Sequence, residues 1–193
     1  MPGIADKKCL SGLPLRLFLP LLLLLPLQSL AADQALQRRV LVGLKLFPAV
    51  LAASQALEPK SELRDIRVLI VHQGDKDNAE ELADTLRAIR EIKGKPLVVE
   101  TIPISHLLHG SNTPPLGLFV SQRNDEDIEM ISRYGQQHNV ITFSPFHGDV
   151  EKGILAGISI SDRILPYINS QTLAALPTGL KTFFLKVAEI YEP

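Results

Sequence analysis

The fold is decided by Ile66-Arg67-Val68-Leu69-Ile70-Val71, a nearly continuous run of apolar and mostly β-branched residues. A run of this kind is typical of a strand that is buried on both faces of a parallel sheet. A turn through Gly74 follows it, and apolar residues then recur at three- and four-residue steps: Ala79, Leu82, Leu86 and Ile89. This spacing predicts a helix after the strand.

The ends of this helix and the next strand can also be predicted. Asp77 and Glu80 have the spacing of a capping box, so we expect the helix to start at Asp77. Gly94 is expected to stop it. The segment 96–102 is the next extended apolar stretch, which completes a strand, helix, strand crossover.

Further alternation of strands and helices follows along the chain. The segments 116–120 and 140–143 are predicted strands, and the helix predicted between them, 125–138, turns Ile128 and Ile131 inward. The irregular loop 106–115 is predicted to lie at the surface. Three such alternations predict an α/β fold, a three-layer sandwich with a largely parallel central sheet.

Both ends of this pattern carry elements of a different kind. Leu36, Val40, Leu41, Leu44 and Phe47 predict an amphipathic helix that Pro48 kinks or ends. The segments 153–161 and 163–169, joined by a tight turn at Ser161-Asp162, predict a C-terminal antiparallel hairpin at one edge of the sheet. A closing amphipathic helix is predicted from its apolar positions: Leu180, Phe183, Phe184, Val187 and Ile190.

The first 31 residues have the order of a cleavable signal peptide. Lys7, Lys8 and Arg16 precede the apolar run 17–27, and the small residues Ser29, Ala31 and Ala32 follow it. Two prolines interrupt the run, and it is shorter than the roughly 20 residues that cross a bilayer. We therefore expect residues 1–31 to be removed near Ala31/Ala32. Residues 32–193 are then a single α/β domain, secreted into the periplasm.

Composition excludes several kinds of chemistry and partner. The single cysteine, Cys9, lies in the predicted signal peptide, so residues 32–193 contain no thiol for a disulfide or a nucleophile. Acidic and basic residues are interleaved and the net charge is −1. Nucleic acid is therefore a poor candidate partner.

No motif specifies a reaction, a cofactor or a metal. His106, His109, His138 and His147 lack the glutamate of a zincin pattern and a cysteine partner, so we expect no metal site. The acidic run Asp125-Glu126-Asp127, with Glu129, suits the first turn of a helix. Ser144 and His147 share a loop without forming a triad. We therefore predict no catalytic residues and no cofactor, and a protein that is not an enzyme.

Three predicted strands are nevertheless followed by polar residues. Open α/β sheets bind ligands in crevices at the carboxyl ends of their strands. A possible ligand crevice is therefore expected at six residues of these loops: His72, Gln73, Ser121, Arg123, Ser144 and His147. This pattern supports an alternative function, that of a periplasmic small-ligand (solute) binding protein.

The C-terminal region resembles a known family. The quoted segments are Gly153-Ile154-Leu155-Ala156-Gly157-Ile158, Arg163-Ile164-Leu165-Pro166-Tyr167-Ile168-Asn169, Gly179-Leu180-Lys181 and Leu185-Lys186-Val187-Ala188. They resemble the C-terminal signature of YfiR-like periplasmic proteins, and the stretch 94–99 is like the second strand of that family. The disulfide cysteines of better-known members are absent here.

The resemblance implies a non-enzymatic periplasmic sensor or regulator of cyclic-di-GMP signalling. Such a protein binds and inhibits an inner-membrane signalling protein, a diguanylate cyclase or a histidine kinase, and tends to form a homodimer. We expect the first helix and the hairpin to form the contact surface, with five residues as candidates: Leu44, Phe47, Arg163, Tyr167 and Asn169. For two of them another role is open, since Asn169 suits a helix cap and Arg163 a surface ion pair.

Overall fold

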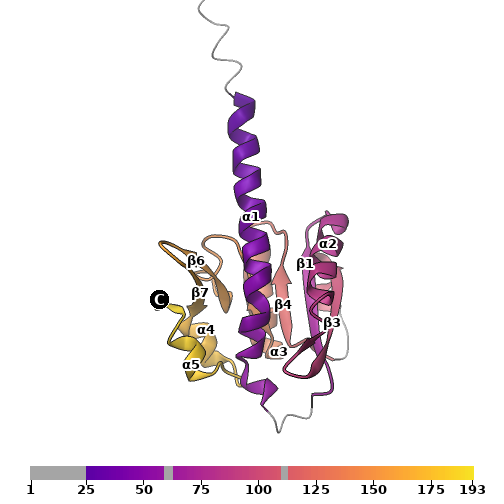
Figure 1. Ribbon diagram of the computed structural model, residues 1–193, viewed down its shortest axis with the longest axis vertical. Helices are drawn as coiled ribbons and strands as arrows, with labels where there is room; N and C mark the ends of the chain where they lie inside the picture. The colour runs from indigo at the N-terminus through magenta and orange to yellow at the C-terminus, as the bar shows by residue number, and fades with distance from the viewer. Residues whose placement is uncertain (1–24, 59–62, 110–112) are drawn as a thin grey trace, which may run out of the picture. The chain divides into compact units, whose positions relative to one another are not determined.

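A computed structural model describes residues 25–58, 63–109 and 113–193, and the side chains of these residues except 25–32, 108 and 109 (Figure 1). Most of the predicted signal peptide, residues 1–31, therefore lies outside the described residues. The chain divides into two units, Met1–Ala35 and Leu36–Pro193. The second unit contains the sheet.

Within the described residues, eight strands form one sheet. Their bounds are β1 Ile66–His72, β2 Glu91–Ile92, β3 Lys95–Pro103, β4 Gly117–Val120, β5 Ile141–Phe143, β6 Ala156–Ile160, β7 Ile164–Asn169 and β8 Glu189–Tyr191. The helices are α1 Leu25–Ala52, α2 Lys76–Arg87, α3 Asp127–His138, α4 Ser170–Ala175 and α5 Thr182–Leu185, with 3-10 turns η1 Gln55–Leu57 and η2 Ile104–His109.

The order of the strands in the sheet is β2-β3-β1-β4-β5-β6-β7-β8. Strand β1 lies between β3 and β4 and is parallel to both. The β4–β5, β5–β6 and β7–β8 pairs are also parallel, whereas β2–β3 and β6–β7 are antiparallel hairpins. The prediction of an α/β fold with a largely parallel sheet and a C-terminal antiparallel hairpin is confirmed.

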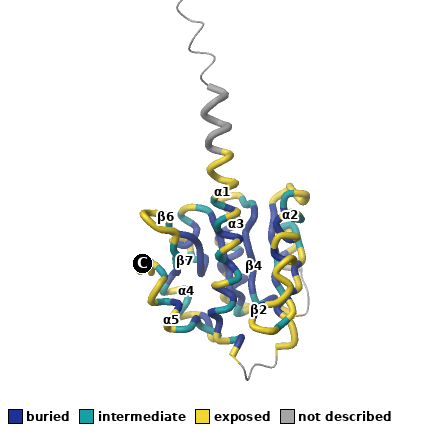
Figure 2. The backbone as a smooth tube through the Cα atoms, in the orientation of Figure 1, coloured by how far each residue is buried: buried dark blue, intermediate teal, exposed yellow. Residues whose placement is uncertain are grey.

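Two separate cores cover the two faces of the sheet. Residues that alternate along β1 divide between them, with Val68 and Ile70 in one core and Val71 in the other. Helices α1 and α2 pack on the first face, and α3 with η2 on the second. The buried strands between these helices are visible as dark blue segments (Figure 2). The arrangement is the three-layer sandwich that the alternating pattern predicts.

Helix α1 does not end at Pro48. It continues to Ala52, and Val50 and Leu51 in its last turns are buried. Proline removes one hydrogen bond from a helix interior. Here burial of the residues that follow it against the sheet outweighs that loss.

Helix α2 begins two residues before the predicted start. Asp75 is the N-cap, and its side chain accepts a hydrogen bond from the backbone N–H of Asn78. The capping box predicted at Asp77 and Glu80 is therefore wrong. Gly94, with φ +74°, does not end this helix but forms the turn of the β2–β3 hairpin. Ile89, beyond the helix, is 40% exposed.

The predicted closing helix is also wrong. Only Thr182–Leu185 are helical, and Glu189–Tyr191 form β8, which pairs parallel with β7 and displaces the hairpin from the edge of the sheet. Phe183 and Val187, which a continuous helix would have to bury, are 64% and 59% exposed. The chain is held just before α5, where the Lys181 N–H donates to the carbonyl of Ala53.

Candidate functional site

The sheet has a switch point between β1 and β4. From β1 the chain crosses through α2 to β3 on one side, and from β4 it crosses through α3 to β5 on the other. The loops that leave the carboxyl ends of β1 and β4 therefore diverge. Open α/β sheets bind ligands in the crevice that this divergence creates.

A cavity of about 490 Å³ lies at this switch point. Such a volume falls within the usual range for small-molecule sites, roughly 300–1,000 Å³. Its walls come from α1, from α2, and from the loops after β1, β4 and β5. The lining residues are Leu36, Gln37, Val40, Leu41, Asp75, Asn78, Glu81, Leu82, Thr85, Ser121, Gln122, Arg123 and Phe146.

The two diverging loops are tied together at the N-terminus of α2. The backbone N–H of Asp75 donates to the Gln122 side-chain carbonyl, at 3.2 Å. The Asp75 carboxylate in turn accepts from the Asn78 N–H at 3.0 Å. Ser121 extends the β1–β4 ladder, because both its N–H and its hydroxyl donate to the Val71 carbonyl at 2.9 Å. This floor of the crevice is therefore fixed by hydrogen bonds.

Arg123 joins the loop after β4 to the loop after β5. Its guanidinium makes two contacts with the buried Asp149, Nε to Oδ2 at 3.0 Å and Nη2 to Oδ1 at 2.7 Å, and a further bond to the exposed Asp125. The guanidinium also lies 5.4 Å above the centre of the Phe146 ring. Ser144 donates its hydroxyl to Asp149 at 2.5 Å. The network holds the Phe146 wall of the cavity in place.

Burial and pairing act on the charges of this network in opposite directions. Burial raises the pKa of Asp149, and the hydrogen bonds from Ser144 and Arg123 offset only part of that effect. Burial alone would lower the pKa of Arg123, but its bonds to Asp149 and Asp125 outweigh burial and raise it. Arg123 is therefore a cation that is already matched by two protein carboxylates.

The six residues predicted to form a crevice divide into three groups. Ser121 and Arg123 line the cavity, together with Phe146 from the same loop as Ser144 and His147. Buried His72 is the last residue of β1 and Gln73 is exposed in the next position, and neither lines the cavity. Ser144 is fully buried and bonded to Asp149, while His147 lines a smaller cavity of about 200 Å³ between α1 and the β6–β7 hairpin.

The five residues predicted to contact a partner also divide. Leu44 and Phe47 are buried in the core, where the Phe47 ring lies 5.6 Å from Phe119 and 5.4 Å from Phe143 between ring centres. They are therefore not part of an exposed surface. The sheet of the same chain covers these two side chains, because the apolar stripe of α1 packs against it.

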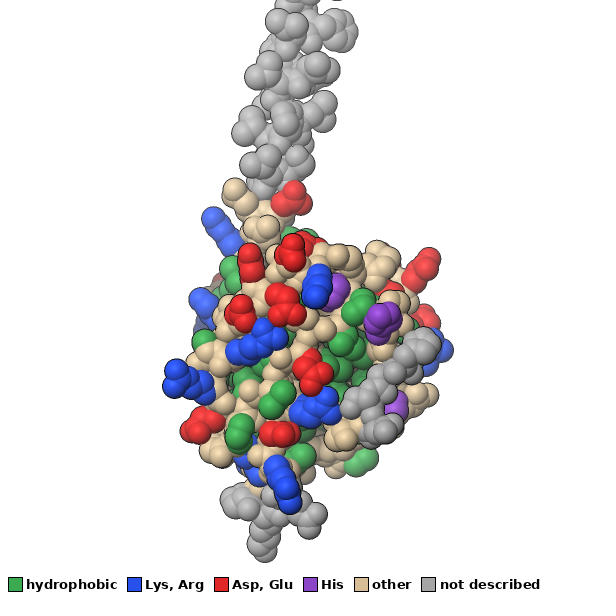
Figure 3. Space-filling model, turned by 90° about the vertical axis from the view of Figure 1, so that its right-hand side faces the viewer, with side chains coloured by type: hydrophobic (Ala, Val, Ile, Leu, Met, Phe, Trp, Pro, Cys, Tyr) green, Lys and Arg blue, Asp and Glu red, His purple; other side chains and the backbone are tan. Residues whose placement is uncertain are grey.

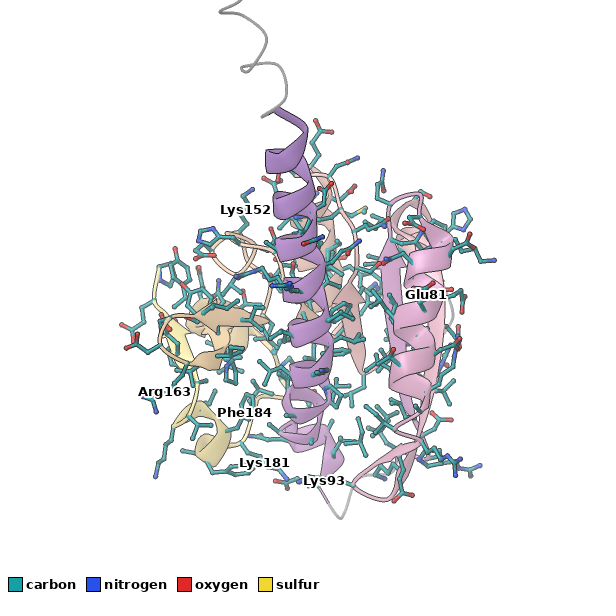
Figure 4. The ribbon with its side chains drawn as sticks, turned by 45° about the horizontal axis from the view of Figure 1, so that its top comes forward. Glu81, Lys93, Lys152, Arg163, Lys181 and Phe184 are labelled. Atoms are coloured by element: carbon teal, nitrogen blue, oxygen red, sulfur yellow. The ribbon has the colours of Figure 1, made fainter. Side chains whose placement is uncertain are left out.

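Residues of the hairpin are partly accessible. Asn169 is buried, donates to the Val150 carbonyl at 2.7 Å, and caps α4 by accepting from the Thr172 N–H, which is the cap role left open above. Tyr167 is half-buried and donates to Glu151 at 3.1 Å. Arg163 is exposed near the turn of the hairpin (Figure 4).

Among the residues whose side chains are described, the histidines and acids considered for a metal do not converge. Over the part of the chain that the structure describes, there is no group of three or more histidine, cysteine or acidic residues that could hold a metal ion. Asp127 accepts from the Asn124 N–H at the start of α3, and Asp125 pairs with Arg123. The hydrogen bond from Arg123 lowers the pKa of Asp125. The side chain of His109 lies outside the described residues.

Sequence reasoning missed the walls that helices contribute. Asn78, Glu81 and Thr85 recur at three- and four-residue steps beside the buried stripe of α2, a signal that marks a second shared face of the helix. Asp149 was missed as well. Asp149 follows Ser144 by five residues, and nothing in the sequence around it indicates that its side chain is buried.

The surface on the α2 and β3 side of the molecule carries interleaved acidic and basic side chains (Figure 3). Within the described residues, no helix is both long enough and apolar enough to cross a membrane.

No family model and no curated protein matches the sequence. Solved structures do resemble the fold. A conserved domain protein from Vibrio cholerae matches with a TM-score of 0.54 and 13% identity, over 79% of this chain and 60% of that one.

Two further structures have described ligands or roles. An ABC domain in complex with L-Trp from Streptococcus pneumonia matches with a TM-score of 0.51 and 13% identity, over 74% of this chain and 60% of that one. The ligand-free, open structure of CD0873, a substrate binding protein with adhesive properties from Clostridium difficile, has a TM-score of 0.51 and 15% identity, over 78% of this chain and 58% of that one. The chain thus spans about 60% of the length of the structures it resembles.

Proposed function

We propose that the chain is a small-ligand-binding protein without enzymatic activity, and that its ligand occupies the crevice between the ends of β1 and β4. The observation that carries this proposal is the 490 Å³ cavity at the switch point of the sheet. The cavity combines apolar walls from α1 with side chains that can donate or accept hydrogen bonds, such as Gln37, Asn78 and Gln122. Ligand sites in proteins have this composition.

The fold comparisons support the same class. One similar structure is described as a complex with L-Trp and another as a substrate binding protein. The predicted signal peptide is in keeping with a periplasmic protein that captures a solute. Ligand sites are usually largely pre-formed, and the hydrogen bond from Asp75 to Gln122 fixes the two loops of this crevice relative to each other.

A thermal-shift screen of the purified chain against small metabolites tests the proposal. A ligand that binds only the native state raises the melting temperature, and the shift grows with the ratio of ligand concentration to Kd. The variant Thr85→Trp should abolish the shift, since Thr85 lines the cavity and its hydroxyl bonds only within its own helix, to the Glu81 carbonyl. An indole placed there fills the crevice and breaks no contact between elements.

The matched control is Gln137→Trp. Gln137 is exposed on α3, which packs on the other face of the sheet. This variant should keep the full thermal shift. Binding that survives Thr85→Trp would show that the ligand sits elsewhere, and the absence of any ligand from a broad screen would refute the proposal.

Regulation by protein contact is the second candidate function, and one observation favours it. Ile160 and Ile164, on either side of the hairpin turn, are 52% and 51% exposed, and Arg163 is exposed between them. Exposed apolar side chains beside a charge are typical of contact surfaces. The partner that the YfiR-like resemblance implies is an inner-membrane diguanylate cyclase or histidine kinase.

A pull-down with membrane extracts tests this second candidate. A contact through the hairpin should be lost in the double variant Ile160→Ser/Ile164→Ser and kept in Thr85→Trp. The reverse pattern would assign the retained protein to the crevice instead. Capture that neither variant changes would contradict a role for either surface.

A further inference from the structure

We propose that the crevice takes a small organic cation, an ammonium group on an apolar body, in preference to an anion or an amino acid. The inference rests on the proposed function and adds the chemical class of the ligand. It follows from which charges in the crevice are already matched by the protein and which are not.

The first place where an anion could bind is the N-terminus of α2. Free backbone N–H groups at a helix N-terminus attract negative charge. Here the Asp75 carboxylate accepts from the Asn78 N–H at 3.0 Å, so a protein anion occupies the position already. The N–H of Asp75 itself is bonded to Gln122. A ligand carboxylate would have to approach against the charge of Asp75.

The second place is Arg123, the one basic side chain among the described residues that line the cavity. Its guanidinium bonds to Asp149 through two nitrogens and to Asp125 through the third, and only 13% of its side chain is exposed. One positive charge is thus shared between two carboxylates. A ligand anion would find no unmatched positive charge at Arg123.

The acidic residues that line the cavity, unlike Arg123, have no ion pair within the described residues. Glu81 is an exposed residue of α2 (Figure 4), and it lines the cavity together with residues of α1. Asp75, the N-cap of the same helix, also lines the cavity, and its carboxylate is held by the helix terminus. Two carboxylates therefore face the crevice, and Leu36, Val40 and Leu41 supply an apolar wall opposite them. An ammonium group attached to an apolar body matches both sides.

Four probes that share an indole body separate the charge classes. Tryptamine carries only the ammonium group, indole-3-acetate only the carboxylate, L-Trp carries both, and 3-methylindole neither. Affinity for the purified chain is measured by calorimetry at low and high salt. Tryptamine should bind at least about tenfold more tightly than indole-3-acetate or L-Trp, and high salt should weaken its binding and leave that of 3-methylindole unchanged.

Two variants test which carboxylates are responsible. Asp75→Asn removes the charge and keeps the cap, because asparagine caps helices as well as aspartate does. Glu81→Gln removes the other charge at an exposed position. Each should weaken tryptamine about two- to fivefold and leave 3-methylindole unchanged. The control Asp162→Asn makes the same charge change in the hairpin turn, away from the cavity, and should have no effect.

The outcomes separate this inference from the proposed function. If indole-3-acetate or L-Trp binds as tightly as tryptamine, and Thr85→Trp abolishes that binding, the crevice is a ligand site but the cation preference is wrong. Tryptamine binding that is unchanged in both acid variants overturns the inference too. If none of the four probes binds while another metabolite binds in the crevice, the inference alone fails. If no compound binds at all, the proposed function fails with it.

Discussion

Arg123 and Asp149 form a two-pronged ion pair at the base of the crevice, with Nε 3.0 Å from Oδ2 and Nη2 2.7 Å from Oδ1. Asp149 is fully buried, and it also accepts the Ser144 hydroxyl. A charge in that position is tolerated because Oδ2 accepts hydrogen bonds from Arg123 and Ser144 and Oδ1 lies against the Arg123 guanidinium. The pair also connects two loops that leave different strands.

Replacing Arg123 by methionine should lower the free energy of unfolding by about 3–5 kcal/mol, since the buried Asp149 carboxylate loses its counter-charge. Urea denaturation measures this loss. The double variant Arg123→Met/Asp149→Leu should recover most of it, because no unpaired charge then remains buried. A double variant that is less stable than Arg123→Met would contradict this account.

Asp149 should make stability depend on pH. Burial raises the pKa of Asp149, so as the pH rises from about 4 the unfolded chain loses this proton before the native protein does. The stabilising contribution of the protonated carboxyl is complete below the unfolded pKa and is lost as the pH rises through the native pKa.

The measurement is urea denaturation of the wild type and Asp149→Asn between pH 4 and pH 7. The difference in unfolding free energy, wild type minus variant, should fall as the pH rises. A difference that stays constant or increases would mean that the native pKa of Asp149 is not raised. The loss of the Arg123 pair in the variant adds an offset that does not change this trend.

Changing Phe47 to alanine should destabilise the fold by about 3–5 kcal/mol, the usual loss for a large aromatic side chain removed from a core. Its ring contacts Phe119 and Phe143, and it is fully buried. Denaturation of Phe47→Ala and of Leu41→Ala, at an exposed position of the same helix, provides the comparison. Equal stabilities of the two variants would refute the core assignment.

Tyr167 should ionise at a higher pH than is usual for a tyrosine side chain. Burial, followed by its hydrogen bond to Glu151, raises the pKa of Tyr167 to about 12. A titration of phenolate absorbance should therefore show a late step that Tyr167→Phe removes and Glu151→Gln shifts downward. The stability that this group contributes is present below about pH 10, the unfolded pKa, and is lost as the pH rises through about 12. A last step at pH 10 in the folded protein would contradict the prediction.

Sequence periodicity predicted the centre of the molecule well. The β-branched run at Ile66–His72, the apolar stripe of α2 and the inward residues Ile128 and Ile131 are found as expected, because their burial follows from local spacing. The errors lie at the two ends of α2, where the predicted cap and stop are wrong, and in the C-terminal segment. Apolar residues after Leu180 fit a helical period, but that period predicts a helix only if a surface exists to cover them.

The residues that the loops contribute to the crevice could be predicted from the sequence, whereas those that the helices contribute could not. The rule that ligands bind at the carboxyl ends of parallel strands leads directly to Ser121 and Arg123, because they follow a buried strand in the chain. Which faces of α1 and α2 complete the cavity depends on how each helix is rotated over the sheet. Glu81 and Leu41 could not be assigned to it from their own neighbours in the sequence.

The packing of the Phe47 ring against Phe119 and Phe143 also bears on the order of folding. The sheet can extend from β1 as successive segments are added, but Phe47 on α1, in the first part of this unit in the chain, lacks both of its aromatic neighbours until β4 and β5 have paired. Because contacts distant in sequence form slowly, we expect α1 to dock late. Before α1 docks, its apolar side chains are exposed to solvent. An intermediate of this kind is prone to aggregation.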